Sequence, residues 1–191
     1  MKRQVKAMKT VDLLVEEHKN IKRMLKVGRQ IAIDIMNGAN IDYDDFALII
    51  DFIRNYADDH HHNKEEEVFF KKMKEELGEP MVSGPILAMF SEHDLGRLFV
   101  RNLEEALEEV KAGNNDAKVD VIANLIAYTD LLNRHIDKED NTIYPYGENN
   151  LSKESLAEAE EKMQRLEQDA ESKGVQKKYI DILVSLEKKY L

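Results

Sequence analysis

Apolar residues recur along this chain at intervals of three and four positions, the pattern of helices that bury one face. Segments with glycine, proline or asparagine interrupt the pattern, and between these breaks it predicts four long helices. We expect them from Thr10 to about Asn37, from Asp42 to about Leu77, from Gly84 to about Gly113 and from Asp116 to about Gly147. Because short connections make neighbouring helices antiparallel, the pattern predicts an all-α, up-down-up-down four-helix bundle.

Two further helical segments follow the predicted bundle. The first is very polar and runs from Ser152 to about Lys173, and the second is amphipathic and runs from Val175 to Leu191. Neither contains a histidine. We therefore expect residues 1–147 to form the bundle, and residues 148–191 to form a C-terminal helical extension packed on the bundle or on a partner.

A short phrase occurs twice, as His61-His62-Asn63-Lys64-Glu65 and as His135-Ile136-Asp137-Lys138-Glu139. Each phrase has a histidine and, four residues later, a glutamate. Glu17-His18 precedes the first phrase by 43 residues, and Glu92-His93 precedes the second by 42. The chain therefore contains two copies of a unit with two histidines and one glutamate.

The predicted bundle brings these two units together. His18 and His93 lie near the start of their helices, whereas the other two histidines lie near the end of antiparallel ones, so that all four imidazoles share one level. A glutamate on an apolar stripe is costly to bury unless it is paired or bound to a metal. Imidazole and carboxylate suit iron, manganese or zinc, and two bridging glutamates favour a pair of iron ions with open positions. The predicted metal ligands are His18, His61, Glu65, His93, His135 and Glu139.

Periodicity also selects among three consecutive histidines. His61 shares an otherwise apolar face with Glu65, whereas His62 shares a polar stripe with Glu66, so we expect His62 to face water. His60 lies on the flank of the helix, where we expect a half-exposed surface histidine, the alternative being a hydrogen-bond partner of the ligands. The other explanation of the whole cluster is a buried histidine–glutamate network that holds no metal.

Two tyrosines could also face the predicted centre. Tyr56 and Tyr128 each lie about one turn from a ligand histidine. A tyrosine of the hydrophobic core is the default interpretation of both.

Charge and composition narrow the function further. With 28 basic and 38 acidic side chains, the net charge of −10 disfavours nucleic-acid binding. No apolar run approaches the roughly 20 residues that cross a membrane, and the start from Met1 to Lys6 leads into no apolar signal core, so we expect a cytoplasmic protein. Since the chain has no cysteine, any metal is held by nitrogen and oxygen.

The chain resembles hemerythrin-like proteins of the HHE cation-binding type, from about residue 10 to residue 147. The resemblance implies a four-helix bundle whose non-haem di-iron centre is bridged by the two glutamates. Four segments carry it: Glu16 to Ile21, His61 to Phe70, Ser91 to Arg97, and His135 to Pro145.

Two positions depart from the hemerythrins that carry oxygen reversibly. Those proteins have a second histidine one turn after the third-helix histidine, where this chain has Arg97, and an aspartate, differently spaced, in place of Glu139. The ligand set is closer to bacterial di-iron proteins linked to iron–sulfur repair and to nitrosative or oxidative stress. Those usually carry an N-terminal cysteine-bearing region, which this sequence lacks.

Open metal positions suggest a protein that binds or senses dioxygen or nitric oxide. The alternative is a di-iron enzyme that reduces peroxide, dioxygen or nitric oxide, which would need an electron-donor protein. Iron storage is disfavoured, because ferritin-like bundles pair glutamate and histidine at three-residue spacing. A structural bundle that holds zinc or an inactive site, and a homodimer formed through the C-terminal extension, are further possibilities.

Overall fold

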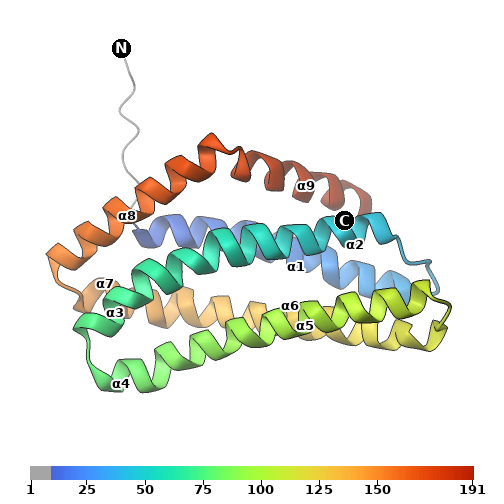
Figure 1. Cartoon of the computed structure of the whole chain (residues 1–191), viewed down its shortest axis with the longest axis horizontal. Coiled ribbons are helices and arrows are strands. Elements are labelled where there is room, and N and C mark those ends of the chain that lie inside the picture. The colour runs from blue at the N-terminus through green and yellow to red at the C-terminus, as the bar shows by residue number, and fades with distance from the viewer. Residues whose placement is uncertain (1–9) are drawn as a thin grey trace, which may run out of the picture.

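The computed structural model describes residues 10–191, and these residues form an up-down-up-down bundle of four long helical rods with extra C-terminal helices (Figure 1). The prediction of an all-α bundle is confirmed. The first nine residues, including the start examined for a signal sequence, lie outside the described part of the chain.

The first rod is α1 (Thr10–Met36), which ends just before Gly38, a glycine with a φ of 96°. Glycine adopts this left-handed conformation without steric cost, so it ends a helix readily. The second rod opens with α2 (Tyr43–Phe52), and the side chain of Asp42 caps it by accepting a hydrogen bond from the backbone N–H of Asp45. Both predicted helix ends are confirmed.

The second rod does not keep a regular α-helical winding. After α2 it passes through two π-helical segments, η1 (Ile53–His62) and η2 (Glu65–Phe69), and ends in α3 (Phe70–Glu76). A π-helix bonds residue i to residue i+5, so it places more residues in each turn than an α-helix. The faces of this rod therefore turn relative to a strict α-helical period.

The third rod begins earlier than predicted. The chain is already helical in α4 (Glu79–Met81) and η3 (Val82–Ile86), before the long α5 (Leu87–Lys111). Pro85 was expected in the first turn of the helix, but it lies inside η3. The wider π-helical winding accommodates a residue without an N–H there.

The fourth rod differs from its predicted start and end. Asp116 does not cap it; this residue lies in a 3₁₀ turn, η4 (Asn115–Ala117), that leads into α6 (Lys118–Lys138). The rod continues through η5 (Glu139–Ile143) and α7 (Tyr144–Asn150), so Gly147 does not break it.

Gly147 instead allows two helices to approach closely. A Cβ atom at this position would lie 2.6 Å from Cζ of Phe69. A helix continues through a glycine when packing requires it, at a cost of roughly 1 kcal/mol relative to alanine. The glycine in the sequence therefore marks a contact and not a turn.

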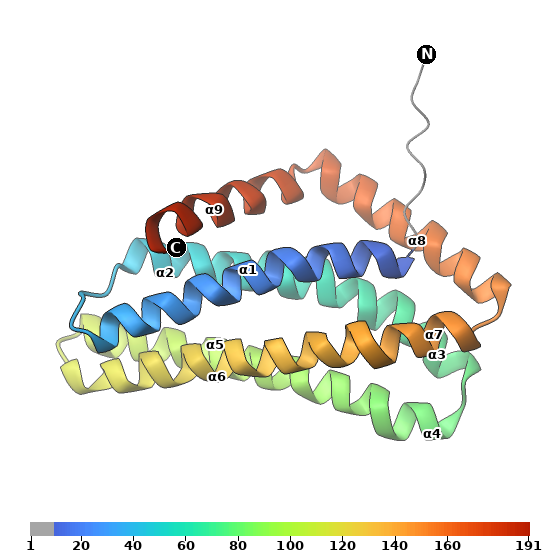
Figure 2. The same cartoon turned by 180° about the vertical axis from the view of Figure 1, so that it is seen from behind.

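The C-terminal helices α8 (Lys153–Ser172) and α9 (Val175–Tyr190) lie along one side of the bundle (Figure 2). The helix α8 contacts α1 and η2, and α9 contacts α1 and α2. The hydroxyl of Ser152 caps α8, as the sequence predicts. Ion pairs fasten α9 to the bundle, from Arg23 to Glu187 at 2.6 Å and from Lys189 to Asp42 at 2.7 Å.

The buried apolar residues form two clusters. One contains residues such as Phe46, Phe52 and Leu125, and the other contains residues such as Phe69 and Phe70. On the first three rods the predicted metal-binding residues lie between the two clusters, and on the fourth Glu139 lies between them while His135 lies at the edge of the first. A buried polar layer therefore divides the core, and both of its sides are packed.

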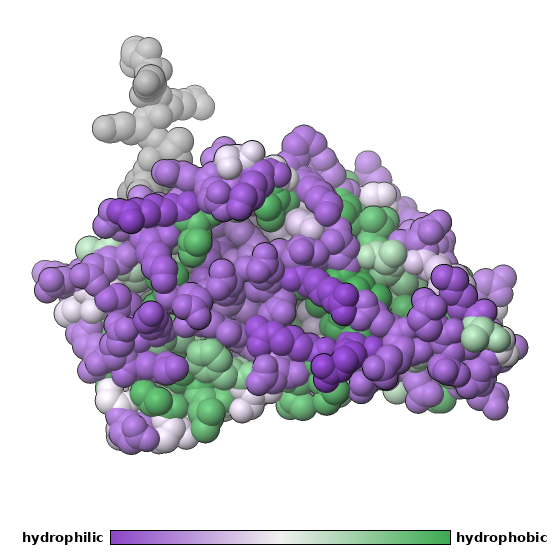
Figure 3. Space-filling view, in the orientation of Figure 1, coloured by the Kyte–Doolittle hydropathy of each residue, from purple (hydrophilic) through white to green (hydrophobic). Residues whose placement is uncertain are grey.

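The face of the molecule seen in Figure 3 is mostly hydrophilic, as the charge predicts. A small hydrophobic group shows over α4 and the start of α5 in this view. The first residue of α5, Leu87, is 58% exposed. Among residues 10–191, no helix is long and apolar enough to cross a membrane.

Candidate metal centre

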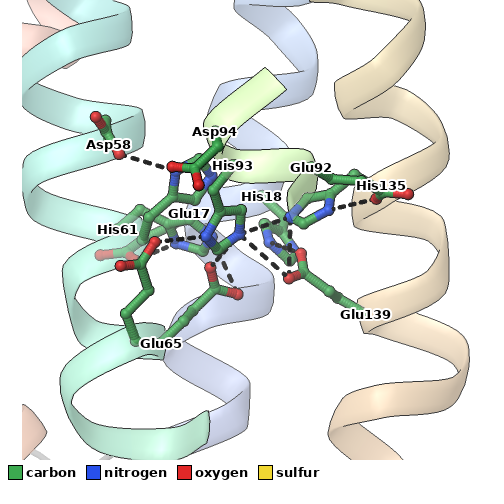
Figure 4. A network of polar contacts seen from close by, with 12 residues as sticks. Glu17, His18, Asp58, His61, Glu65, Glu92, His93, Asp94, His135 and Glu139 are labelled. Atoms are coloured by element: carbon green, nitrogen blue, oxygen red, sulfur yellow. Dashed lines mark hydrogen bonds and ion pairs between the residues drawn. The ribbon is translucent and has the colours of Figure 1, made fainter. Parts of the chain in front are cut away.

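The structure brings the six predicted side chains to one buried point (Figure 4). Each of the four bundle rods contributes, and every one of the six residues is at most 1% exposed. Together with His62 they form two groups that share Glu65, and within each group one donor atom per residue lies within 4.8 Å of all the others. The first group is His18, His61, Glu65 and Glu139, and the second is His62, Glu65, His93 and His135.

The two glutamates connect these groups. The Oε1 atom of Glu65 lies 3.7 Å from Nε2 of His61, and its Oε2 atom lies 3.5 Å from Nε2 of His93. The Oε2 atom of Glu139 lies 3.3 Å from Nε2 of His18, and its Oε1 atom lies 3.0 Å from Nε2 of His135. Each carboxylate therefore presents one oxygen to each group, as a bridging ligand does.

Three oxygens of these carboxylates are buried without a hydrogen-bond partner among the described residues. They are Oε2 of Glu65 and both carboxylate oxygens of Glu139. The nearby imidazoles are close, but their geometry is not that of hydrogen bonds. Because leaving a buried carboxylate oxygen unpaired is costly, the arrangement fits metal ions better than a closed hydrogen-bond network.

The Nδ1 atom of every histidine in the two groups contacts a carboxylate at 2.7–3.2 Å. Such a partner fixes the tautomer, orients the ring and leaves Nε2 free as a ligand. Five pairs of this kind at one point are typical of a metal centre. The pairs are His18–Asp140, His61–Glu17, His62–Asp58, His93–Glu66 and His135–Glu92.

The prediction that His62 faces water is wrong. His62 is only 5% exposed, and its ring stacks on that of His93 with the centroids 3.9 Å apart. It lies at the end of the π-helical segment η1, where the wider winding turns it inward from the polar face that an α-helical period assigns. A fifth histidine therefore joins the four that were predicted.

The prediction of a half-exposed His60 is also wrong, and His60 contacts the carboxylate that holds a ligand histidine, not a ligand itself. The side chain of His60 is only 7% exposed, and its Nε2 atom lies 2.9 Å from Oε1 of Glu17. Since Glu17 also contacts Nδ1 of His61, one carboxylate connects His60 to a histidine of the centre.

The tyrosine beside the centre is Tyr144, which the sequence reasoning missed. Its buried hydroxyl donates a hydrogen bond to Oε1 of Glu65 and lies 3.4 Å from Nε2 of His18. Tyr56 instead accepts a hydrogen bond from Asn20, and Tyr128 lines a pocket beside the centre. The sequence contained a signal for it, because Tyr144 follows Glu139 by five residues on the same rod, although it is not within one turn of a ligand histidine.

The repeated phrase is matched by a repeated arrangement. In the first half, Glu17 joins His61 to Lys64, and in the second half Glu92 joins His135 to Lys138. In each unit, the glutamate that precedes the first histidine therefore orients the second histidine, which lies on the following rod. The sequence contained this signal as the repeated Glu-His pair, but the role of the glutamates needed the structure.

Ionisation differs sharply across the centre. Burial, followed by the charge of His18, lowers the pKa of His61 to about 3, and burial, followed by His62, lowers that of His93 to about 3. For His135, burial acts to lower the pKa, but the carboxylates of Glu139 and Glu92 outweigh it and raise the pKa to about 9. Burial, followed by the charge of Glu139, raises the pKa of Glu65.

Metal binding is therefore expected to release protons. At pH 7 the metal-free protein carries a proton on His135, whose pKa is raised to about 9, and the raised pKa of Glu65 favours the protonated form of this carboxyl, whereas ligands must be deprotonated. The affinity for metal should therefore rise as the pH increases to about 9. Titration calorimetry in buffers of different ionisation enthalpy would measure the proton release. Binding without proton release would contradict the assignment, as would an affinity that does not change between about pH 6 and pH 9.

Comparison with known proteins agrees with this geometry. The model of the hemerythrin HHE cation-binding domain matches residues 9–146, which include the first three rods, the fourth rod except its last residues, and all residues of the two groups. No curated protein and no solved structure gave a match. The match covers most of the chain, and the chain belongs to the hemerythrin HHE cation-binding domain family, whose helical proteins bind metal cations.

Proposed function

We propose that this protein holds two iron ions at the centre and binds a small gas there, dioxygen or nitric oxide. The observation that carries the proposal is the set of five histidines, each fixed by a carboxylate at Nδ1, around two glutamates with unpartnered buried oxygens. Nitrogen and oxygen donors of this kind suit iron, with manganese and zinc as alternatives. Bound iron would supply a redox-active Lewis acid with room for an added ligand.

We assign the donors to two positions. The two-histidine position takes His18 and His61, and the three-histidine position takes His62, His93 and His135, with both glutamates shared between them. Counting the shared carboxylates and a bridging oxygen, the two-histidine position has one donor fewer. The addition of His62 thus leaves one open position, where four histidines would leave two.

A pocket of about 230 Å³ reaches the centre from the surface. Its walls include His62 and His93 at the centre, the apolar residues Ile53 and Val100, and Arg97. Arg97 is held by Asp58 and Glu66, the same carboxylates that orient two of the histidines. The pocket therefore gives a small ligand a path to the three-histidine position, whereas His18 and His61, beside the open position, are not part of its lining.

The gas-binding proposal is tested by spectroscopy on the iron-loaded protein. We expect absorption bands of an oxygen-bridged iron pair in the oxidised protein, and a spectral change when the reduced protein meets dioxygen or nitric oxide. The variant His61→Ala, which lacks a ligand of the two-histidine position, should lose both signals. Iron-loaded protein with no such bands and no response to either gas would contradict the proposal.

One observation favours the enzyme as a second candidate. The hydroxyl of Tyr144 lies between Glu65 and His18, where it could deliver a proton to a ligand that is being reduced. Peroxide or nitric oxide reduction needs such protons as well as an external electron donor. Turnover with a donor that is no faster than that of His61→Ala would eliminate this candidate.

A further inference from the structure

The two halves of the centre are alike in contacts but differ in their exposure to water. Lys64 is 1% exposed and its partner Glu17 is 6% exposed, whereas Lys138 is 44% exposed and its partner Glu92 is 21% exposed. Both lysines occupy the same place in the repeated phrase. Something outside the repeat therefore covers the first half and leaves the second open.

The cover is the C-terminal helix α8, which contacts η2 and contributes Glu167. The Oε1 atom of Glu167 accepts a hydrogen bond from Nζ of Lys64 and lies 3.3 Å from Nε2 of His60. The amide of Gln176, at the start of α9, donates to the other oxygen at 2.7 Å and orients the carboxylate. In the second half, no residue of α8 or α9 contacts Lys138 among the described contacts.

The positive charge of Lys64 therefore already lies among these acidic groups. The donors of Glu17, His60 and Glu167 lie close enough together to hold a metal ion. However, Nζ of Lys64 contacts all three. The ammonium group is therefore the cation of this cluster, and the cluster acts on the metal centre through Glu17.

We infer that the C-terminal helices α8 and α9 make the two metal positions unequal, and that Glu167 is a positioning residue for the two-histidine position. The inference rests on the proposed two-metal centre. Its path runs from Glu167 to Lys64 and His60, then to Glu17, and finally to Nδ1 of His61. Among the contacts of residues 10–191, no equivalent path from α8 or α9 reaches His135.

The charge of Glu167 gives the direction of the effect. It shares the positive charge of Lys64 with Glu17, so Glu17 remains free to accept strongly from the ring of His61 and to make this imidazole a better ligand. If Glu167 is made neutral, Lys64 is balanced by Glu17 alone. The pull of Glu17 on His61 then weakens, and the surroundings of the metal become more positive.

The test compares Glu167→Gln with Glu158→Gln in the full-length protein. Both residues lie on α8 and pair with a lysine of the second rod, but Glu158 pairs with Lys72 on the surface, away from the centre. Titration with Co²⁺ should show about tenfold weaker binding of one of two ions in Glu167→Gln, the lower end of effects for residues behind a ligand. Glu158→Gln should bind both ions as the unaltered chain does.

Proton resonances of the Co²⁺-loaded protein identify the position. The Nδ1–H signal of His61 should shift and exchange faster with water in Glu167→Gln, whereas the signal of His135 should not change. Unchanged binding, equal weakening of both ions, or an effect confined to His135 would overturn the inference while leaving the two-metal centre intact. If the unaltered protein takes up no Co²⁺, the proposed function itself fails.

Discussion

Replacing Glu65 by glutamine is expected to lower the metal content from two ions per chain to one or none. Glu65 presents one oxygen to His61 and the other to His93, and it belongs to both donor groups. An amide has a single, neutral oxygen donor, so it bridges two cations poorly. Elemental analysis of the purified variant, loaded with iron under the same conditions as the parent protein, measures the loss.

The metal-free fold should tolerate this substitution. Burial raises the pKa of Glu65, which favours the neutral form of this side chain in the metal-free protein, and glutamine is neutral as well. Glu67→Gln is the matched control, because Glu67 belongs to the same acidic run but is exposed. Two ions bound by Glu65→Gln with unchanged affinity would show that Glu65 is not a bridge.

Removing the metal should lower the unfolding temperature by roughly 10 °C. A ligand that binds only the folded chain stabilises it by about 4 kcal/mol at a concentration a thousandfold above its dissociation constant. For a chain of this size, each kcal/mol shifts the midpoint by about 2–4 °C. The loss should be greater than for a surface ion, since the empty centre leaves carboxylate oxygens buried and unpaired.

Calorimetric unfolding of the iron-loaded and the chelator-treated protein makes the comparison. The variant Glu65→Gln serves as the control, because a chain that binds little metal should respond little to the chelator. Equal unfolding temperatures of loaded and stripped protein would mean that the bundle does not depend on the metal, and would favour the buried network without metal.

Much of the fold and the core of the centre could be predicted from the sequence. Long amphipathic periods and short connections define an antiparallel bundle, and they set His18 and His93 level with the histidines of the other two rods. The duplicated phrase then selects His61 and Glu65, because each copy supports the register of the other. Pattern and repetition were sufficient for these residues, although His61 and Glu65 lie in the π-helical segments η1 and η2.

His62 could not be predicted because the winding changes before it. An α-helical period assigns it to the polar stripe of Glu66, and only the π-helical segment Ile53–His62 turns it toward His93. The unequal spacings in the two repeats, 43 and 42 residues, are consistent with one extra residue in the first half. The sequence shows this difference in spacing, but one extra residue in a loop would explain it equally well.

The carboxylates behind the histidines could not be assigned from sequence either. Each comes from a different rod than the histidine it holds, except Asp58, which lies four residues before His62. Glu17, for example, precedes His18 in the sequence but holds His61. Contacts of this kind depend on how two rods are rotated about their axes, which a periodic pattern fixes only approximately.

Anomalous X-ray diffraction from crystals of the iron-loaded protein tests the central claim most directly. The account predicts two iron peaks, one bonded to His18 and His61 and the other bonded to His62, His93 and His135, with Glu65 and Glu139 touching both. A single peak, no peak, or iron bound only at the outer cluster of Glu17, His60 and Glu167 would contradict it.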